Sequence, residues 1–65
     1  MKFRVGDTVT VKNEFLEGWE ELTSLVGVID KTRPNTGIFD YVVYFDHTNR
    51  DGGLYGFDEH ELDRF

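Results

Sequence analysis

The chain has no cysteine, and in a chain of 65 residues this feature most limits how it can fold. A domain of this size buries only about 60% of the surface that its unfolded chain exposes, so small domains commonly depend on disulfides or metals. Disulfides and thiolate-bound zinc are both excluded here. The fold must therefore rest on packing, for which six Phe, three Tyr and one Trp provide large side chains. We expect a single domain spanning residues 1–65.

Apolar and polar residues alternate with a period of two along much of the chain, which is typical of half-buried strands. In the clearest case, residues 38–45, one face carries Phe39, Tyr41, Val43 and Phe45, and the other carries Asp40, Val42 and Tyr44. Apolar residues on both faces predict that this strand is central. Val9 and Val11 alternate with their polar neighbours over residues 8–12, and the same alternation upstream is interrupted at residues 6–7. Other strands are predicted at residues 25–29 and 54–57 and at the end of the chain.

Glycine and polar residues mark the boundaries of these strands. Gly27 lies where a bulge or a close backbone approach would suit a glycine. Residues 32–37 are expected to form a turn, and residues 46–53 a polar loop. Asp58 and Glu61 have the spacing of a capping box, so a single helical turn is predicted before the last strand.

The segment 13–24 does not alternate. Phe15, Trp19 and Leu22 have the spacing of one face of a short amphipathic helix. Gly18 opposes a regular helix by up to about 1 kcal/mol. We therefore expect a long loop that contains a helical turn and is held down by its aromatic side chains.

Five short strands, with turns every eight to twelve residues, predict an all-β fold. A small five-stranded SH3-like barrel, with a long first loop and a short helical turn before the last strand, accounts for this order. Barrel closure would also protect the apolar strands from edge-to-edge aggregation.

The order of these segments resembles SH3-like barrels of the KOW and nitrile-hydratase β-subunit type. Residues 3–12 match their opening pattern, hydrophobic-x-x-Gly-Asp-x-Val-x-Val. Residues 25–30, 41–46 and 57–62 resemble their second, third and final strands. Free-standing barrels of this kind are similar to small proteins coded by phages and prophages of Gram-positive bacteria, which implies a regulator or host-modifying factor.

The KOW branch of this family contacts RNA, ribosomes or RNA polymerase through basic and aromatic loop residues. This chain departs from that pattern because its long first loop is acidic. A KOW-like contact with nucleic acid would depend on Lys31, Arg33 and Arg50 and is the alternative function.

Thirteen acidic residues against seven Lys and Arg give a net charge of −6, which disfavours generic binding to phosphate backbones. The beginning of the chain does not read as a signal peptide, and no apolar run is long enough to span a bilayer. We expect a cytoplasmic, monomeric protein without membrane association.

Catalytic chemistry has little support in the sequence. Ser24 is the only serine and has no neighbouring histidine, so no nucleophile is predicted. Paired carboxylates are unavoidable with so many acids. We expect no catalytic residues and no cofactor.

Metal binding is not predicted either. His47 and His60 have carboxylates beside them and would need the fold to bring them together. Residues 47–58 follow a calcium-loop spacing, but His47 and Asp58 stand where that loop has Asp and Glu. A polar turn is the preferred interpretation.

Protein binding is the preferred function. The predicted partner is a protein with a basic surface, which would be oriented by acidic residues and held by aromatic ones. Trp19 is interpreted as either a core anchor or an interface residue, and Tyr44 is the preferred outward tyrosine. The predicted partner-binding residues are Phe15, Glu17, Trp19, Glu20, Glu21, Tyr44 and Tyr55.

Overall fold

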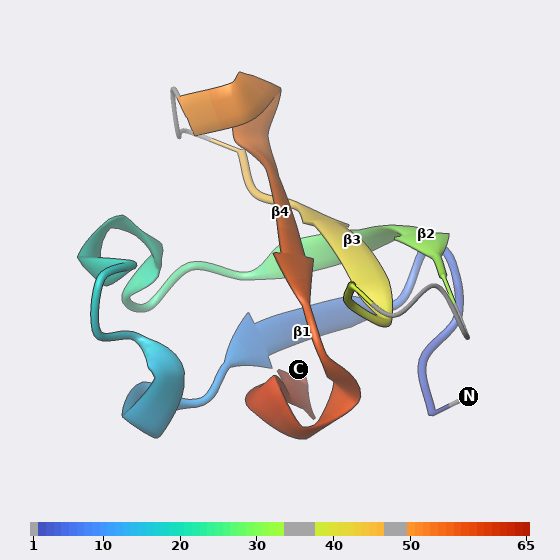
Figure 1. Ribbon diagram of the computed structural model, residues 1–65, viewed down its shortest axis with the longest axis horizontal. Coiled ribbons are helices and arrows are strands. Elements are labelled where there is room, and N and C mark those ends of the chain that lie inside the picture. The colour runs from blue at the N-terminus through green and yellow to red at the C-terminus, as the bar shows by residue number, and fades with distance from the viewer. Residues whose placement is uncertain (1, 34–37, 47–49) are drawn as a thin grey trace.

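The computed structural model describes residues 2–33, 38–46 and 50–65. Five antiparallel strands form one sheet with the order β4-β3-β2-β1-β5 (Figure 1). The strands are β1 (Thr8–Val11), β2 (Gly27–Thr32), β3 (Tyr41–Tyr44), β4 (Leu54–Phe57) and β5 (Leu62–Arg64). Four short 3-10 turns accompany them in the described residues: η1 (Asn13–Phe15), η2 (Glu20–Leu22), η3 (Arg50–Gly53) and η4 (Glu59–Glu61). The predicted all-β class is confirmed.

The strand order places the last strand beside the first. β1 pairs with β2 on one side and with β5 on the other, while β2, β3 and β4 follow one another as a meander. This arrangement is consistent with an SH3-like fold. The predicted closure is absent from the described residues, because the sheet ends at β4 on one side and at β5 on the other. The radius of gyration, 10.7 Å, is that of a compact globule.

The core is built from the inward positions of the alternating strands. Tyr41, Val43 and Phe45 are inaccessible to solvent, as the alternation predicts for the central strand. Phe45 contacts Tyr55 and Phe57 edge-on, with ring centroids 5.7 and 6.5 Å away. The other buried core residues are Phe3, Val9, Val11, Leu22, Ile29 and Leu62.

Gly27 allows the first residue of β2 to approach β3. A Cβ atom at this position would lie 2.6 Å from Val43 Cγ1 and 2.8 Å from Phe45 Cε1. The side chains of Val43 and Phe45 therefore occupy the space that a larger residue at position 27 would need. The irregularity in the pairing of β2 with β3 falls further along, between Ile29 and Lys31.

The first strand begins at Thr8, after the interruption predicted at residues 6–7, because residues 4–7 form a turn in which the Asp7 amide donates to the Arg4 carbonyl at 2.9 Å. One strand boundary differs from the prediction. The pairing of β2 continues through Thr32 into the segment predicted as a turn. Residues 34–37 of that segment lie outside the described residues.

The two predicted helical turns are confirmed. The segment 13–24 is a loop with 3-10 turns η1 and η2 rather than a helix. Asp58 and Glu61 form a capping box around η4, in which Glu61 Oε1 accepts the Asp58 amide at 2.7 Å.

Candidate functional site

The long first loop, residues 12–26, joins β1 to β2 and is folded by its own backbone. Successive tight turns are closed by hydrogen bonds from Phe15 to Lys12, from Trp19 to Leu16 and from Leu22 to Trp19, each 2.8 to 2.9 Å long. Gly18 has a φ of +83°, a conformation that glycine adopts without strain. The loop therefore has an ordered shape.

Trp19 fastens the middle of this loop to the core. Its ring stands edge-on to Tyr55 and Phe57, with centroid distances of 5.4 and 6.1 Å. The side chain remains partly exposed, although it packs against the buried cluster. Trp19 thus anchors the loop to the core while part of its side chain stays exposed to solvent.

Phe15 joins the loop to the turn before β5. Its ring lies 5.3 Å from the imidazole of His60 in η4, again edge-on. Phe15 is partly buried, as is its neighbour Leu16, and both pack against the core. Half-buried apolar side chains therefore extend along the loop from η1 to Trp19.

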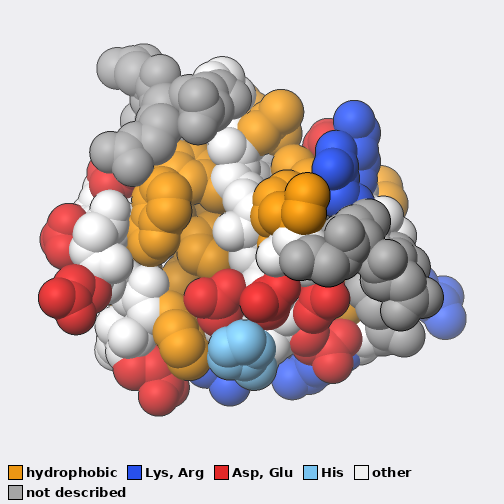
Figure 2. Space-filling model, in the orientation of Figure 1, with side chains coloured by type: hydrophobic (Ala, Val, Ile, Leu, Met, Phe, Trp, Pro, Cys, Tyr) orange, Lys and Arg blue, Asp and Glu red, His pale blue; other side chains and the backbone are white. Residues whose placement is uncertain are grey.

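Acidic side chains surround these apolar groups. Glu14, Glu17, Glu20 and Glu21 are all exposed. Figure 2 shows hydrophobic side chains in the middle of this face of the molecule, with acidic side chains at its left margin and below them. An apolar centre with a charged rim is the arrangement found in many protein interfaces.

Two of these acids also hold the loop in shape. Glu20 Oε2 accepts the Gly18 amide at 2.8 Å, and this hydrogen bond lowers the pKa of the Glu20 carboxyl below its ordinary value of 4.5. Glu21 Oε2 accepts the Tyr55 hydroxyl at 3.3 Å. Glu20 and Glu21 therefore combine exposure with a structural contact.

The two tyrosines among the predicted partner-binding residues, Tyr44 and Tyr55, lie on opposite faces of the sheet. Tyr55 is only 4% exposed because its ring is part of the core, and its role in partner binding stays a prediction. Tyr44 is 40% exposed and lies on the opposite, outer face of the sheet, as its position in the alternation predicts. Trp19 and Tyr44 therefore do not form one surface.

The three residues of the alternative nucleic-acid site come from β2, the segment after it and η3. Lys31 is exposed opposite Val42 of β3. The Arg33 guanidinium lies 5.5 Å from the centre of the Phe39 ring. Arg50 belongs to η3, and its side chain lies outside the described residues.

One apolar row on the outer face was not singled out from the sequence. Val28, Tyr44 and Leu54 are direct neighbours across β2, β3 and β4, and all three are exposed. Each lies at an outward position of its own strand. The row emerges only once the register between the strands is known.

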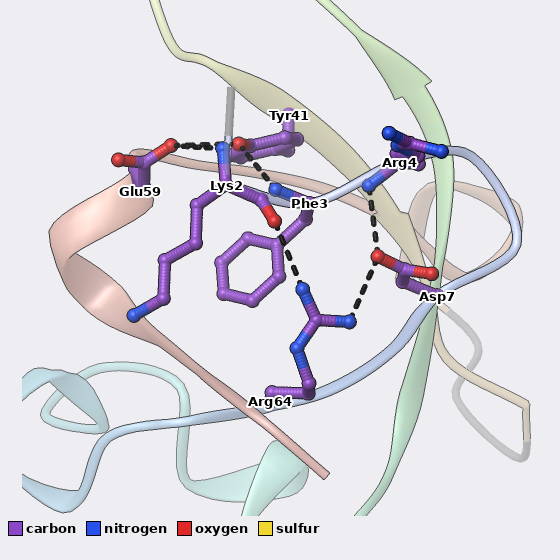
Figure 3. A network of polar contacts seen from close by, with 7 residues as sticks. All are labelled: Lys2, Phe3, Arg4, Asp7, Tyr41, Glu59 and Arg64. Atoms are coloured by element: carbon purple, nitrogen blue, oxygen red, sulfur yellow. Dashed lines mark hydrogen bonds and ion pairs between the residues drawn. The ribbon is translucent and has the colours of Figure 1, made fainter.

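A polar network holds the beginning of the chain against η4 and β5 (Figure 3). The Tyr41 hydroxyl accepts the Phe3 amide at 3.1 Å and donates to Glu59 Oε1 at 2.8 Å. Glu59 Oε1 also accepts the Lys2 amide at 2.9 Å, and these hydrogen bonds lower the pKa of the Glu59 carboxyl. The network stabilises the fold around Phe3.

Arg64 of β5 extends this network to Asp7. Its guanidinium donates to Asp7 Oδ2 at 3.0 Å and to the Lys2 carbonyl at 2.9 Å, and it lies over the Phe3 ring. Asp7 Oδ2 also accepts the Arg4 amide at 2.9 Å. These hydrogen bonds lower the pKa of the Asp7 carboxyl, the one from Arg4 most strongly.

The described residues provide no enclosed site for a small ligand. Residues 2–33, 38–46 and 50–65 form no pocket and contain no group of three or more His, Asp and Glu side chains arranged to hold a metal ion. His47 and Asn49 of the calcium-like spacing lie outside these ranges. In the described part of the chain, no helix has the length and apolar character needed to cross a membrane.

Comparison of the chain with protein-family models, with curated proteins and with solved structures found no match. The likeness to SH3-like barrels therefore rests on the strand order and the sequence pattern. The KOW, nitrile-hydratase and phage resemblances stay predictions.

Proposed function

We propose that this chain is a non-enzymatic protein-binding module that docks a basic surface of a partner protein through its acidic first loop. One observation carries the proposal: partly buried apolar side chains of the loop are surrounded by exposed glutamates. Because the loop is already folded by its own hydrogen bonds, little conformational entropy remains to be lost on binding. If the phage resemblance holds, the partner is a host protein and the module acts as a regulator or inhibitor.

The two kinds of side chain have different roles in this proposal. Exposed glutamates at the rim attract and orient a basic partner, which raises the association rate more than the affinity. Trp19 supplies the large, rigid contact area that is typical of interface hot spots. Glu14 and Glu17 are the clearest rim residues, since Glu20 and Glu21 also support the loop.

The intrinsic fluorescence of Trp19 tests the proposal. Trp19 is the only tryptophan, so its emission reports on the first loop alone. Titration with a Lys-rich peptide should shift the emission, and a Glu-rich peptide of equal length should not. Glu17→Lys should weaken binding of the Lys-rich peptide several-fold. Asp30→Lys makes the same charge change at an exposed position of β2 and serves as the matched control.

Equal weakening by the two variants would show a response to net charge alone and would contradict the proposal. Fluorescence anisotropy of labelled DNA and RNA, at low and moderate salt, tests the alternative function. Salt-dependent binding that is lost in Lys31→Glu and Arg33→Glu would replace the proposed function with a KOW-like nucleic-acid contact.

A further inference from the structure

The free edge of β4 carries backbone groups that no strand pairs with in the described residues. β4 is the last strand of the sheet on its side and pairs only with β3. The Phe45 amide donates to the Gly53 carbonyl at 2.8 Å. By the alternation of antiparallel ladders, Tyr55 and Phe57 also bond to β3, whereas the amide and carbonyl groups of Leu54 and Gly56 point away from it.

The two edge strands of the sheet differ in composition. β5 carries Asp63 and Arg64, which form ion pairs with Lys12 at 3.8 Å and with Asp7 at 3.0 Å. β4 reads Leu-Tyr-Gly-Phe, without a charge or a proline. Proteins commonly protect edge strands with charges, prolines or bulges, because an open edge is a template for another strand. β4 lacks this protection.

The open edge lies next to the candidate protein-binding face. On the core side of β4, Trp19 packs against Tyr55 and Phe57, and Glu21 accepts the Tyr55 hydroxyl. On the outer side, Leu54 is 41% exposed. Figure 2 shows a strip of backbone or uncharged polar side chains in the middle of this face, with hydrophobic side chains on both sides of it and acidic side chains beyond those on the left.

We propose that the partner binds by strand addition: an extended, basic segment pairs with the free edge of β4 beside Trp19. This inference rests on the proposed function and specifies how the partner is recognised. Hydrogen bonds to Leu54 and Gly56 supply the main-chain part of the interaction. Every second side chain of the added strand faces the first loop, where lysine or arginine contacts the exposed glutamates. The remaining side chains of the added strand lie on the side of Leu54.

Strand addition is best tested by changing the peptide rather than the protein. A Cβ atom on Gly56 would lie 2.5 Å from Phe39 Cδ1, so substitution at this edge position would disturb the sheet itself. The probe is a blocked peptide of alternating lysine and valine, six residues long. Two matched versions carry N-methyl groups on alternate amides, one on the odd and one on the even positions. Binding is followed by the emission of Trp19.

Strand addition uses only every second amide of the peptide. One methylated version should therefore lose about tenfold in affinity, since two hydrogen bonds are removed, and the other should bind as the parent does. In the complex with the parent peptide, the amides of Leu54 and Gly56 should exchange with solvent more slowly. The Tyr55 amide, already bonded to β3, is the internal control.

The outcomes separate this inference from the proposed function. Binding of the parent peptide with equal effects of the two methylation patterns, or with unchanged exchange at Leu54 and Gly56, overturns strand addition and leaves the proposed function standing. Absence of any binding by the basic peptide overturns both.

Discussion

The hydroxyl of Tyr41 gives the sharpest stability prediction. Tyr41 is the first residue of β3 and has no exposed surface, and its hydroxyl joins two separate segments of the chain. It accepts the Phe3 amide at 3.1 Å and donates to Glu59 Oε1 at 2.8 Å. Tyr41→Phe removes this oxygen and leaves the ring and its contacts in place.

The expected cost follows from what the missing oxygen leaves behind. Phe3 is inaccessible to solvent, so its amide loses its acceptor in a place that water cannot easily reach. An unsatisfied buried donor costs about 1–3 kcal/mol. Glu59 loses less, because its carboxylate is closer to solvent and keeps the Lys2 amide at 2.9 Å. For a domain of this size, 1 kcal/mol shifts the Tm by about 4–8 °C.

Thermal unfolding followed by circular dichroism measures this cost. Tyr44→Phe is the matched control, because the Tyr44 hydroxyl donates to Asp46 at 3.3 Å on the exposed face. We expect the control to stay within about 0.5 kcal/mol of the parent protein, as surface substitutions usually do. Equal Tm values for Tyr41→Phe and Tyr44→Phe would refute the idea that the Phe3 amide depends on Tyr41.

Three further predictions concern stability. The fold should lose stability as the pH falls below about 4, because carboxyls with lowered pKa values in the folded state stabilise it only while they are ionised. Unfolding measured at several acidic pH values checks this. Stability should also fall above pH 10.0, the ordinary pKa of tyrosine, because burial raises the pKa of Tyr41 in the folded state and the Tyr41 hydroxyl therefore loses its proton first in the unfolded chain. In Tyr41→Phe, stability should fall less steeply with pH in this range. Gly27→Ala should cost about 1–3 kcal/mol in chemical denaturation, because its Cβ would overlap Val43 and Phe45, whereas Gly18→Ala, in open space, should show only the backbone strain of its positive φ. The carboxyls with lowered pKa values are Asp7, Glu20 and Glu59.

Local patterns were sufficient to predict the elements of this fold. Alternation placed Tyr41 and Val43 inward and Tyr44 outward, because a strand side chain has only two faces to choose from. The capping box at Asp58 and the irregular first loop were likewise encoded within a few residues.

Features that depend on distant residues were missed. The extent of β2 was underestimated because Thr32 continues the ladder only through its pairing with Tyr41. The burial of Tyr55 depends on contacts with Trp19 and Phe45, which lie elsewhere in the sequence. The open edge of β4 could not be predicted, since alternation does not reveal which strands end a sheet.

For the candidate site, too, local features could be predicted from the sequence and features that depend on distant residues could not. The sequence left Trp19 as either a core anchor or an interface residue, since a large aromatic among glutamates suits either role. It grouped Tyr44 with Trp19, and the sheet places them on opposite faces. Only the pairing of β3 with β4 decides that separation.

Chemical-shift mapping of the protein during titration with the alternating lysine–valine peptide would show which surface binds a basic strand. We expect the largest changes to fall on the first loop, residues 12–26, and on β4, and expect β5 and the exposed Asp30 to be little affected. Changes of similar size at every acidic residue, or changes centred on Lys31 and Arg33, would contradict the claim that the acidic first loop is the binding face.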